Sequence, residues 1–271
     1  MLERVNEEVT RIPGKMANTY LVEAPKGLIL VDTGLPGTER RITKALQQLG
    51  KTSESVKLIL ITHRHLDHIG SVSAIKHMFP KAVITSHPFE KPYIAGTLVA
   101  NVPPAWTLPG RMMRRLTGFG MWLMKFLRLL KYKPIYVDKP ADDESILEST
   151  GLDGSILWTP GHTKGSITLF LNKTKTAIVG DLLRNGHGKL VEPRLMESPA
   201  QTGASVNRLL ELGPSTICPG HGKPASASKI RLSKRTIEQA QGGERPVEKK
   251  KEKREVPDDV DLDALARDLT V

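Results

Sequence analysis

Short apolar runs separated by turn-forming residues recur along most of this chain. Residues 57–61 read Lys-Leu-Ile-Leu-Ile, an apolar and β-branched run that is typical of a buried strand. Similar runs predict further strands, and apolar residues at three- and four-residue spacing predict helices between them. The strands are expected at 20–23, 28–31, 57–61, 82–85, 155–158, 166–171, 176–179 and 216–218, and the helices at 37–49, 69–78, 200–212 and 226–241. This succession predicts a layered α/β arrangement.

Residues 88–140 interrupt the succession with a stretch that is both apolar and basic. From Trp106 to Val137 there are seven basic residues and no acidic one. A membrane-spanning helix needs about 20 mostly apolar residues, so these charges argue against a transmembrane segment. The pattern predicts a basic amphipathic helix instead. Three roles are open for it: a lid over an active site, a homodimer contact or a membrane-surface patch. The first two are favoured, because enzymes often place mobile elements beside their sites.

The charge of the chain is unevenly distributed. The net charge is +11, but residues 244–271 hold seven Lys or Arg and nine Asp or Glu, which leaves +13 on residues 1–243. We therefore expect a globular domain over 1–243, with 88–140 as a helical insertion, and a charged, flexible tail over 244–271. A basic domain suits anionic substrates, nucleic acid or an anionic membrane surface without choosing among them.

Two features of the sequence indicate the cellular compartment in which the protein is found. Cys218 is the only cysteine, so an intramolecular disulfide is excluded and a reducing environment is favoured. The first eight residues are largely polar and lack the apolar core of a secretory signal. Both features predict a cytoplasmic protein.

The sequence His-Arg-His-Leu-Asp-His at 63–68 directly follows the strand expected at 57–61. His63 and His65 stand two residues apart, so in an extended loop their side chains point the same way, and Asp67 continues that alternation. Imidazole nitrogens and carboxylate oxygens bind borderline divalent metals such as zinc. Further candidate ligands, each beside a glycine and after a predicted strand, are His162, Asp181 and His221.

These motifs, in this order, resemble the metallo-β-lactamase fold superfamily. His-x-His-x-Asp-His is followed by Gly-His-Thr, Gly-Asp and Pro-Gly-His-Gly, as in the glyoxalase II-like hydrolase branch, and the resemblance covers most of residues 15–224. It implies a four-layer αββα sandwich of two mixed sheets with the metals at one edge. It also implies the ligands: His63, His65 and His162 for a first metal, Asp67, His68 and His221 for a second, and Asp181 as the bridge. Asp32, in Val-Asp-Thr-Gly, matches the motif that supports the ligand loop from behind.

The motifs of this chain differ from those of several branches of the superfamily, and these differences argue against the activities of those branches. Asp181 in place of a bridging cysteine, and His68 after Asp67, argue against a zinc β-lactamase of the cysteine-ligand type. His65 stands where flavodiiron proteins carry glutamate. About 50 residues follow His221, many in the charged tail, which argues against glyoxalase II with its C-terminal helical domain. Quorum-quenching lactonases usually have a tyrosine after the bridging aspartate, and residues 182–220 contain none. The additional C-terminal motifs of RNase Z-like nucleases are not found either.

The resemblance therefore implies a metal-dependent hydrolase that uses a metal-bridging hydroxide. Two divalent ions are expected, with zinc favoured over iron or manganese, and Asp67 is expected to orient the hydroxide as well as bind metal. The predicted substrate is a small ester, thioester or lactone. An anionic acyl compound is favoured because the 88–140 insertion mixes apolar and basic side chains.

Other functions stay open at this point. One is a persulfide dioxygenase-like enzyme on the same fold, which holds one iron through residues matching His63, His162 and Asp181. Another is a phosphodiesterase or nuclease, and a third is a protein that recruits a partner and keeps its metal for structure.

Overall fold

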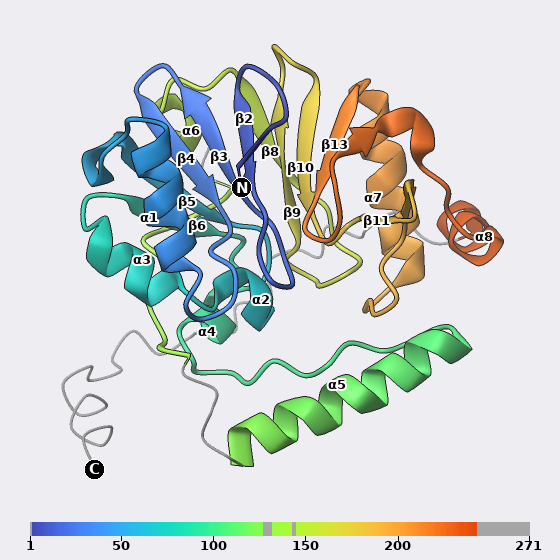
Figure 1. Ribbon diagram of the computed structural model, residues 1–271. Coiled ribbons are helices and arrows are strands. Elements are labelled where there is room, and N and C mark those ends of the chain that lie inside the picture. The colour runs from blue at the N-terminus through green and yellow to red at the C-terminus, as the bar shows by residue number, and fades with distance from the viewer. Residues whose placement is uncertain (1, 127–131, 143–144, 243–271) are drawn as a thin grey trace.

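Two β-sheets stacked face to face form the centre of the molecule, which the computed structural model describes over residues 2–126, 132–142 and 145–242 (Figure 1). Within these residues the first sheet has seven strands in chain order: β1 (Glu3–Arg4), β2 (Val9–Ile12), β3 (Thr19–Ala24), β4 (Gly27–Val31), β5 (Val56–Ile61), β6 (Val83–Ser86) and β7 (Lys139–Pro140). The strands from β1 to β4 pair antiparallel, and those from β4 to β7 pair parallel. The sheet is therefore mixed.

The second sheet is also mixed and has five strands among the described residues. Their order across the sheet is β14 (Ala225–Ser226), β13 (Thr216–Pro219), β10 (Thr176–Gly180), β9 (Ile167–Leu171) and β8 (Gly154–Trp158). Only the pair formed by β10 and β13 is parallel. A separate hairpin joins β11 (Arg184–Gly186) to β12 (Lys189–Val191).

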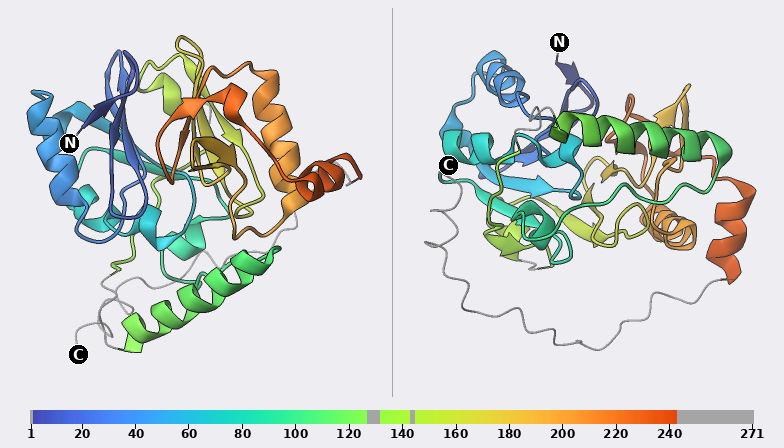
Figure 2. Two further views of the ribbon diagram at one scale, coloured as in Figure 1. Left: turned by 45° about the vertical axis from the view of Figure 1, so that its right-hand side comes forward. Right: turned by 90° about the horizontal axis from the view of Figure 1, so that it is seen from below.

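Helices cover the outer face of each sheet (Figures 1 and 2). Helices α1 (Glu39–Gln48) and α3 (Val72–Met78) lie on the first sheet, and α7 (Pro199–Glu211) lies on the second. Helix α8 (Lys234–Gly242) packs on α7, where a side chain at Gly203 would collide with Ala240 and Thr236. The expected αββα sandwich is thus present.

Three buried apolar clusters hold these four layers together. The first joins α1 and α3 to the first sheet through residues such as Ile42, Ile75 and Ile59. The second lies between the sheets and includes Leu58, Leu60, Leu169 and Ile178. The third joins α7 to the second sheet and includes Val206, Leu209 and Phe170. Because burial of apolar area is the main favourable contribution to folding, this layering also fixes where the loops between strands emerge.

The segment predicted as a helical insertion contains α4 (Lys91–Ile94), α5 (Leu108–Phe126) and β7. Figure 1 shows α5 beneath the end of the sandwich that carries α2 (Leu66–Ile69), and the view from below in Figure 2 shows it crossing in front of that end. Among the described residues, no helix combines the length and apolar character needed to cross a bilayer. The tail at 244–271 lies outside the described residues, so the division into domain and tail stays a prediction.

Two of the predicted helices were wrong in their bounds. The helix expected at 69–78 is instead two helices, α2 and α3, separated by residues 70 and 71. A side chain at Gly70 would collide with Pro36, and the hydroxyl of Ser71 donates to the Leu35 carbonyl at 2.7 Å, so tertiary contacts break the helix there.

The helix expected at 226–241 begins only at Lys234. Residues 225–226 form β14 and Ala227–Lys229 form a short 3-10 helix. Ile230 then forms a bridge with Leu190, and Arg231 N donates to the Leu190 carbonyl at 2.7 Å, so the helix cannot begin earlier. The short strands β1, β2, β7, β11, β12 and β14 were not predicted. Strand β2 is buried at all four positions and so lacks the alternation of a half-buried strand.

Candidate metal centre

The seven predicted ligands converge at the end of the sandwich where the central strands finish. His63 and His65 follow β5, and Asp67 and His68 lie in α2, directly after that loop. The others follow strands of the second sheet: His162 comes after β8, Asp181 after β10 and His221 after β13. Carboxyl ends of strands from both sheets therefore contribute to one site.

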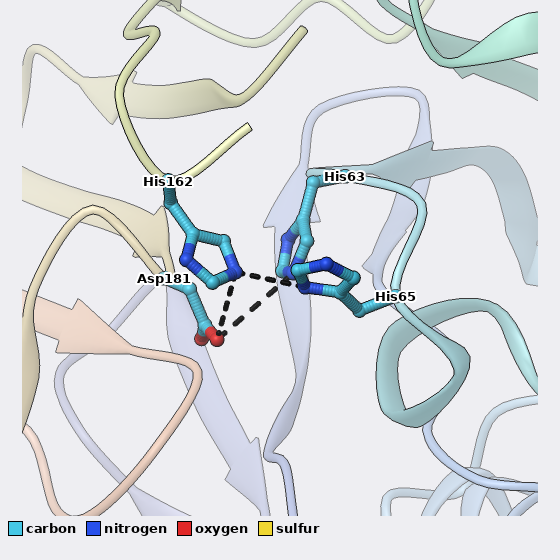
Figure 3. Close-up of side chains that lie close together, drawn as sticks. All are labelled: His63, His65, His162 and Asp181. Carbon is cyan, nitrogen blue, oxygen red and sulfur yellow. Dashed lines mark hydrogen bonds and ion pairs between the residues drawn. The ribbon is translucent and has the colours of Figure 1, made fainter. Parts of the chain in front are cut away.

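The first group consists of His63, His65, His162 and Asp181, whose ligand atoms all lie within 4.8 Å of one another (Figure 3). His162 Nε2 lies 2.8 Å from His65 Nδ1 and 3.4 Å from Asp181 Oδ2. His63 Nε2 lies 3.9 Å from the same carboxylate oxygen. Ligand atoms around a tetrahedral zinc stand roughly 3.3 Å apart, given metal–ligand distances of about 2.0–2.2 Å. The spacing of this group is suited to one such ion.

The second group consists of Asp67, His68 and His221. His221 Nε2 lies 3.3 Å from Asp67 Oδ2 and 3.1 Å from Asp181 Oδ2. His68 Nε2 lies 3.4 Å from the other oxygen of Asp181. The carboxylate of Asp181 thus contacts both groups.

Several buried polar atoms at this point make no hydrogen bond. They are Nε2 of His63 and His68, and Oδ1 of Asp181. A buried polar atom without a partner costs about 1–3 kcal/mol, so native proteins seldom leave several together. Imidazole nitrogens and a carboxylate oxygen are also the donors that zinc and similar divalent ions prefer. The side chains therefore fit a metal centre.

The opposite ring nitrogen of most of these histidines is held by a neighbour. His63 Nδ1 lies 3.0 Å from Thr62 Oγ1, and His68 Nδ1 lies 2.7 Å from Asp32 Oδ2. The rings of His162 and His221 are held through Nδ1 by backbone carbonyls at 2.8 and 3.1 Å. Partners of this kind orient a metal-binding imidazole and select the nitrogen that faces the metal.

Asp32 is placed where the resemblance implied, behind the ligand loop. It follows β4 with a positive φ of 60°, a backbone conformation that Asp and Asn adopt more readily than most residues. One carboxylate oxygen accepts from Thr62 N and the other from Thr62 Oγ1, both at 2.8 Å. Asp32 therefore ties the end of β5 to the His68 ring.

The imidazoles of the first group are held in the neutral form. Burial lowers the pKa of His63 well below its ordinary value, and neighbouring histidines lower it further. Burial likewise lowers the pKa of His65 to about 3 and lowers that of His162. Because metals bind neutral imidazole, this group needs no deprotonation before it takes up an ion.

The second group has the opposite charge pattern. The carboxylate of Asp181 raises the pKa of His221 to about 10. Burial opposes a charge on His68, but Asp32 and Asp181 raise its pKa well above the usual value. Burial disfavours the charged form of Asp67, yet the nearby histidines lower its pKa to about 2. These groups form a set of opposite charges in which a divalent cation would replace the two imidazole protons.

A buried ion-pair network beside the ligands was missed in the sequence. Glu90, just before α4, is fully buried and accepts from Arg64 N and Arg64 Nη1, both at 3.0 Å. It also accepts from Thr163 Oγ1 at 2.9 Å and Gly165 N at 2.8 Å. Arg64 makes a second ion pair with Glu197. Glu90 thus connects the loop of His63 and His65 to the loop of His162, and no motif around Glu90 indicates this.

Two arginines lie close to the metal centre on the side of the β11–β12 hairpin. Arg184 begins β11, and its buried Nε has no hydrogen-bond partner. Burial lowers the pKa of Arg184, and the charge of Arg194 lowers it further, while Glu192 and Asp181 act in the opposite direction. Arg194 is exposed and lies next to Leu195, whose carbonyl holds His162. The two guanidinium groups therefore repel each other, and the carboxylates of Glu192 and Asp181 partly offset that repulsion.

A family model described as the metallo-β-lactamase superfamily matches residues 12–221. The chain is 26% identical over 241 residues to the probable metallo-hydrolase YflN of Bacillus subtilis, a match that covers 80% of this chain and 84% of that protein. It is 26% identical over 193 residues to the hydroxyacylglutathione hydrolase GloC of Haemophilus influenzae, covering 70% of this chain and 78% of that protein.

A similar solved structure is that of the metallo-β-lactamase family protein TTHA1429 from Thermus thermophilus. It superposes with a TM-score of 0.58 at 21% identity and covers 88% of this chain and 78% of that one. At this identity the likeness concerns the fold.

Proposed function

The chain belongs to the metallo-β-lactamase superfamily, a family of metal-binding hydrolases, and we propose that it is a dinuclear zinc hydrolase acting on a small acyl thioester, ester or lactone. The motifs in the sequence predicted this family. The number and identity of the ions and the class of substrate are our proposal.

The observation that carries the proposal is the sharing of Asp181 between two groups of ligands. Its Oδ2 atom lies 3.4 Å from His162 Nε2 and 3.1 Å from His221 Nε2, and those histidines belong to different groups. A site for one structural ion needs about four ligands, whereas seven candidates meet here. A pair of adjacent ions accounts for the whole set.

A pair of divalent ions supplies a nucleophilic hydroxide at neutral pH and polarises the carbonyl oxygen of the substrate. Asp67 lies at the more open side of the centre, with 17% of its side chain exposed. Its pKa of about 2 keeps it a carboxylate at neutral pH, so it orients a water molecule by accepting a hydrogen bond. The water oxygen would add to the acyl carbon and the bond from that carbon to sulfur or oxygen would break, while the proton released by the water would pass to the departing thiolate or alkoxide.

Arg184 and Arg194 support an anionic group on the substrate. Arginine is suited to carboxylate and phosphate because its planar fork donates two parallel hydrogen bonds. The unpartnered Nε of Arg184 leaves a donor available near the centre. A relative named hydroxyacylglutathione hydrolase acts, by that name, on an acylated thiol that is itself anionic. Among the three classes we therefore favour the thioester.

The test begins with metal content by elemental analysis of the purified full chain. The same preparation is then assayed on an anionic acyl thioester, an ester, a lactone and bis-nitrophenyl phosphate. We expect about two zinc ions per chain and turnover of the thioester above the other substrates. Turnover of the phosphodiester alone would overturn the acyl proposal. One iron per chain with oxygen-dependent turnover would favour the persulfide dioxygenase-like alternative.

A pair of histidine variants separates the metal centre from general effects on the protein. His65→Ala removes a half-buried candidate ligand of the first group, while His77→Ala removes an exposed histidine at the end of α3. We expect His65→Ala to lose about one metal ion and nearly all turnover, and His77→Ala to keep both. Full activity in His65→Ala would contradict the assignment.

A further inference from the structure

Helix α5 is attached to the sandwich mainly at its N-terminal base. Trp106 Nε1 donates to the Met196 carbonyl at 2.9 Å, and the Arg235 guanidinium lies 4.8 Å from the centre of the Trp106 ring. Ala105 forms a bridge with Leu195. Beyond this base, α5 runs across the end of the molecule that also carries α2 (Figures 1 and 2). One face of the helix is therefore turned away from the sandwich.

The helix carries large apolar side chains that are exposed to solvent. Leu108 is 82% exposed, and Met112 and Leu116 are each 65% exposed. They are spaced four residues apart, so a turn of about 100° per residue places them within one narrow stripe. Soluble proteins seldom leave such a stripe uncovered, and it marks a surface that contacts something else.

Basic side chains border the stripe. Arg111 and Arg115 precede Met112 and Leu116 by one residue, and both are exposed. Residues 106–137 contain no Asp or Glu that could neutralise them locally. A second copy of this chain would bring the same basic helix against itself, and like charges close together oppose such a contact. An apolar surface that carries negative charge is the complementary occupant.

We infer that α5 docks peripherally on an anionic lipid membrane. Helices with an apolar stripe and flanking arginines lie in the plane of the interface, with the apolar side chains among the acyl chains and the cations near the lipid phosphates. Docking in this way brings the end of the molecule with the metal centre close to the bilayer. The inference does not depend on the reaction catalysed, because it concerns binding alone.

The experiment is sedimentation of the full chain with lipid vesicles. One set contains phosphatidylcholine with about one third phosphatidylglycerol, and the other contains phosphatidylcholine only. We expect at least about tenfold tighter binding to the anionic set, weakening as sodium chloride rises from about 0.1 M to about 0.5 M because salt screens the attraction. Equal binding to both sets, or binding to neither, would overturn the inference.

Variants locate the contact on α5. The triple substitution Leu108→Ser, Met112→Ser and Leu116→Ser removes exposed side chains only, so thermal unfolding should be unchanged while vesicle binding falls about tenfold or more. Arg111→Gln with Arg115→Gln should weaken binding to anionic vesicles and reduce its dependence on salt. The matched control is Leu210→Ser, which removes an exposed leucine of α7 and should leave binding unchanged.

The stripe could instead contact a second copy of this chain, and size-exclusion chromatography with light scattering tests this by giving the molecular mass in solution. We expect the wild type and the triple variant to have the same mass. A dimer that the triple variant loses, together with no binding to anionic vesicles, would show that the stripe is a protein interface and would refute membrane docking.

Discussion

Replacement of Glu90 by glutamine should destabilise the protein strongly. Glu90 is fully buried and receives hydrogen bonds from Arg64, Thr163 and Gly165. Glutamine keeps the shape of the side chain but removes its negative charge. All the groups around the Glu90 carboxylate are hydrogen-bond donors, so the amide nitrogen of glutamine, itself a donor, would have no acceptor there. Arg64, only 7% exposed, would keep its positive charge with a weaker set of partners.

The size of the effect follows from the burial of the pair. Breaking a buried ion pair by removing one partner costs about 3–5 kcal/mol. Arg64 would retain Glu197, whose side chain is 32% exposed, so we expect the lower end, about 3 kcal/mol. For a domain of this size each kcal/mol shifts the melting temperature by about 2–4 °C, so Tm should fall by about 6–12 °C. Glu90→Gln should also weaken metal binding, because it loosens two ligand loops at once.

The assay is urea unfolding followed by circular dichroism, with a chelator present so that bound metal does not add to the stability. Glu197→Gln is the matched control, since it removes the partly exposed partner of the same arginine. Its cost should be about 1 kcal/mol or less. A loss below about 0.5 kcal/mol for Glu90→Gln, or equal losses for the two variants, would refute the reasoning.

Three further predictions concern other positions. Asp32→Asn keeps a residue that tolerates positive φ but weakens the hydrogen bond between residue 32 and His68 Nδ1. Zinc affinity, measured by competition with a chelator, should therefore fall about 10–100-fold, and an unchanged affinity would contradict the supporting role of Asp32. Cys218 is buried and burial raises its pKa, so its thiol should react with a thiol reagent only as the protein unfolds; rapid reaction in the native state would mean that β13 is not enclosed between the layers. Burial lowers the pKa of His87 to about 4 in the folded protein, whereas an unperturbed histidine has a pKa of about 6.5. Between these two values the unfolded chain binds a proton that the folded protein does not, so stability should decrease as the pH falls from about 6.5 to about 4. His87→Gln should not show this decrease. If the free energies of unfolding of the two proteins, measured by urea titration, differ by the same amount at pH 7 and pH 4.5, the prediction is wrong.

The order of motifs allowed much of the fold to be predicted. Long apolar strands such as β4 and β5, and the loop at 63–68 that follows β5, have strong local patterns. Short elements were missed because tertiary contacts define them. Strand β14, for example, exists only through its pairing with Thr216 and Ile217 of β13.

The same limit applies to the site. The candidate ligands could be predicted from the histidine-rich loop at 63–68 and from the glycine-containing turns around His162, Asp181 and His221, and the structure places them in two adjacent groups. Glu90 and Arg184 have no comparable pattern. Glu90 lies 26 positions from Arg64 and 73 from Thr163, so only the fold shows that it joins their loops. The buried Nε of Arg184 has no hydrogen-bond partner, as is also true of Arg64 Nε, and only the fold reveals this.

The candidate ligands come from both sheets, which would have a consequence for the lifetime of the protein in a cell. His63 and His65 belong to a loop of the first sheet, and His162, Asp181 and His221 to loops of the second. An ion held by both sets would be a cross-link between the two halves and would stabilise the native state in proportion to its supply. Chains made during metal starvation would open more often at this edge, and proteases would remove them first. The amount of this protein in the cell would then follow the availability of its metal, with no separate regulator.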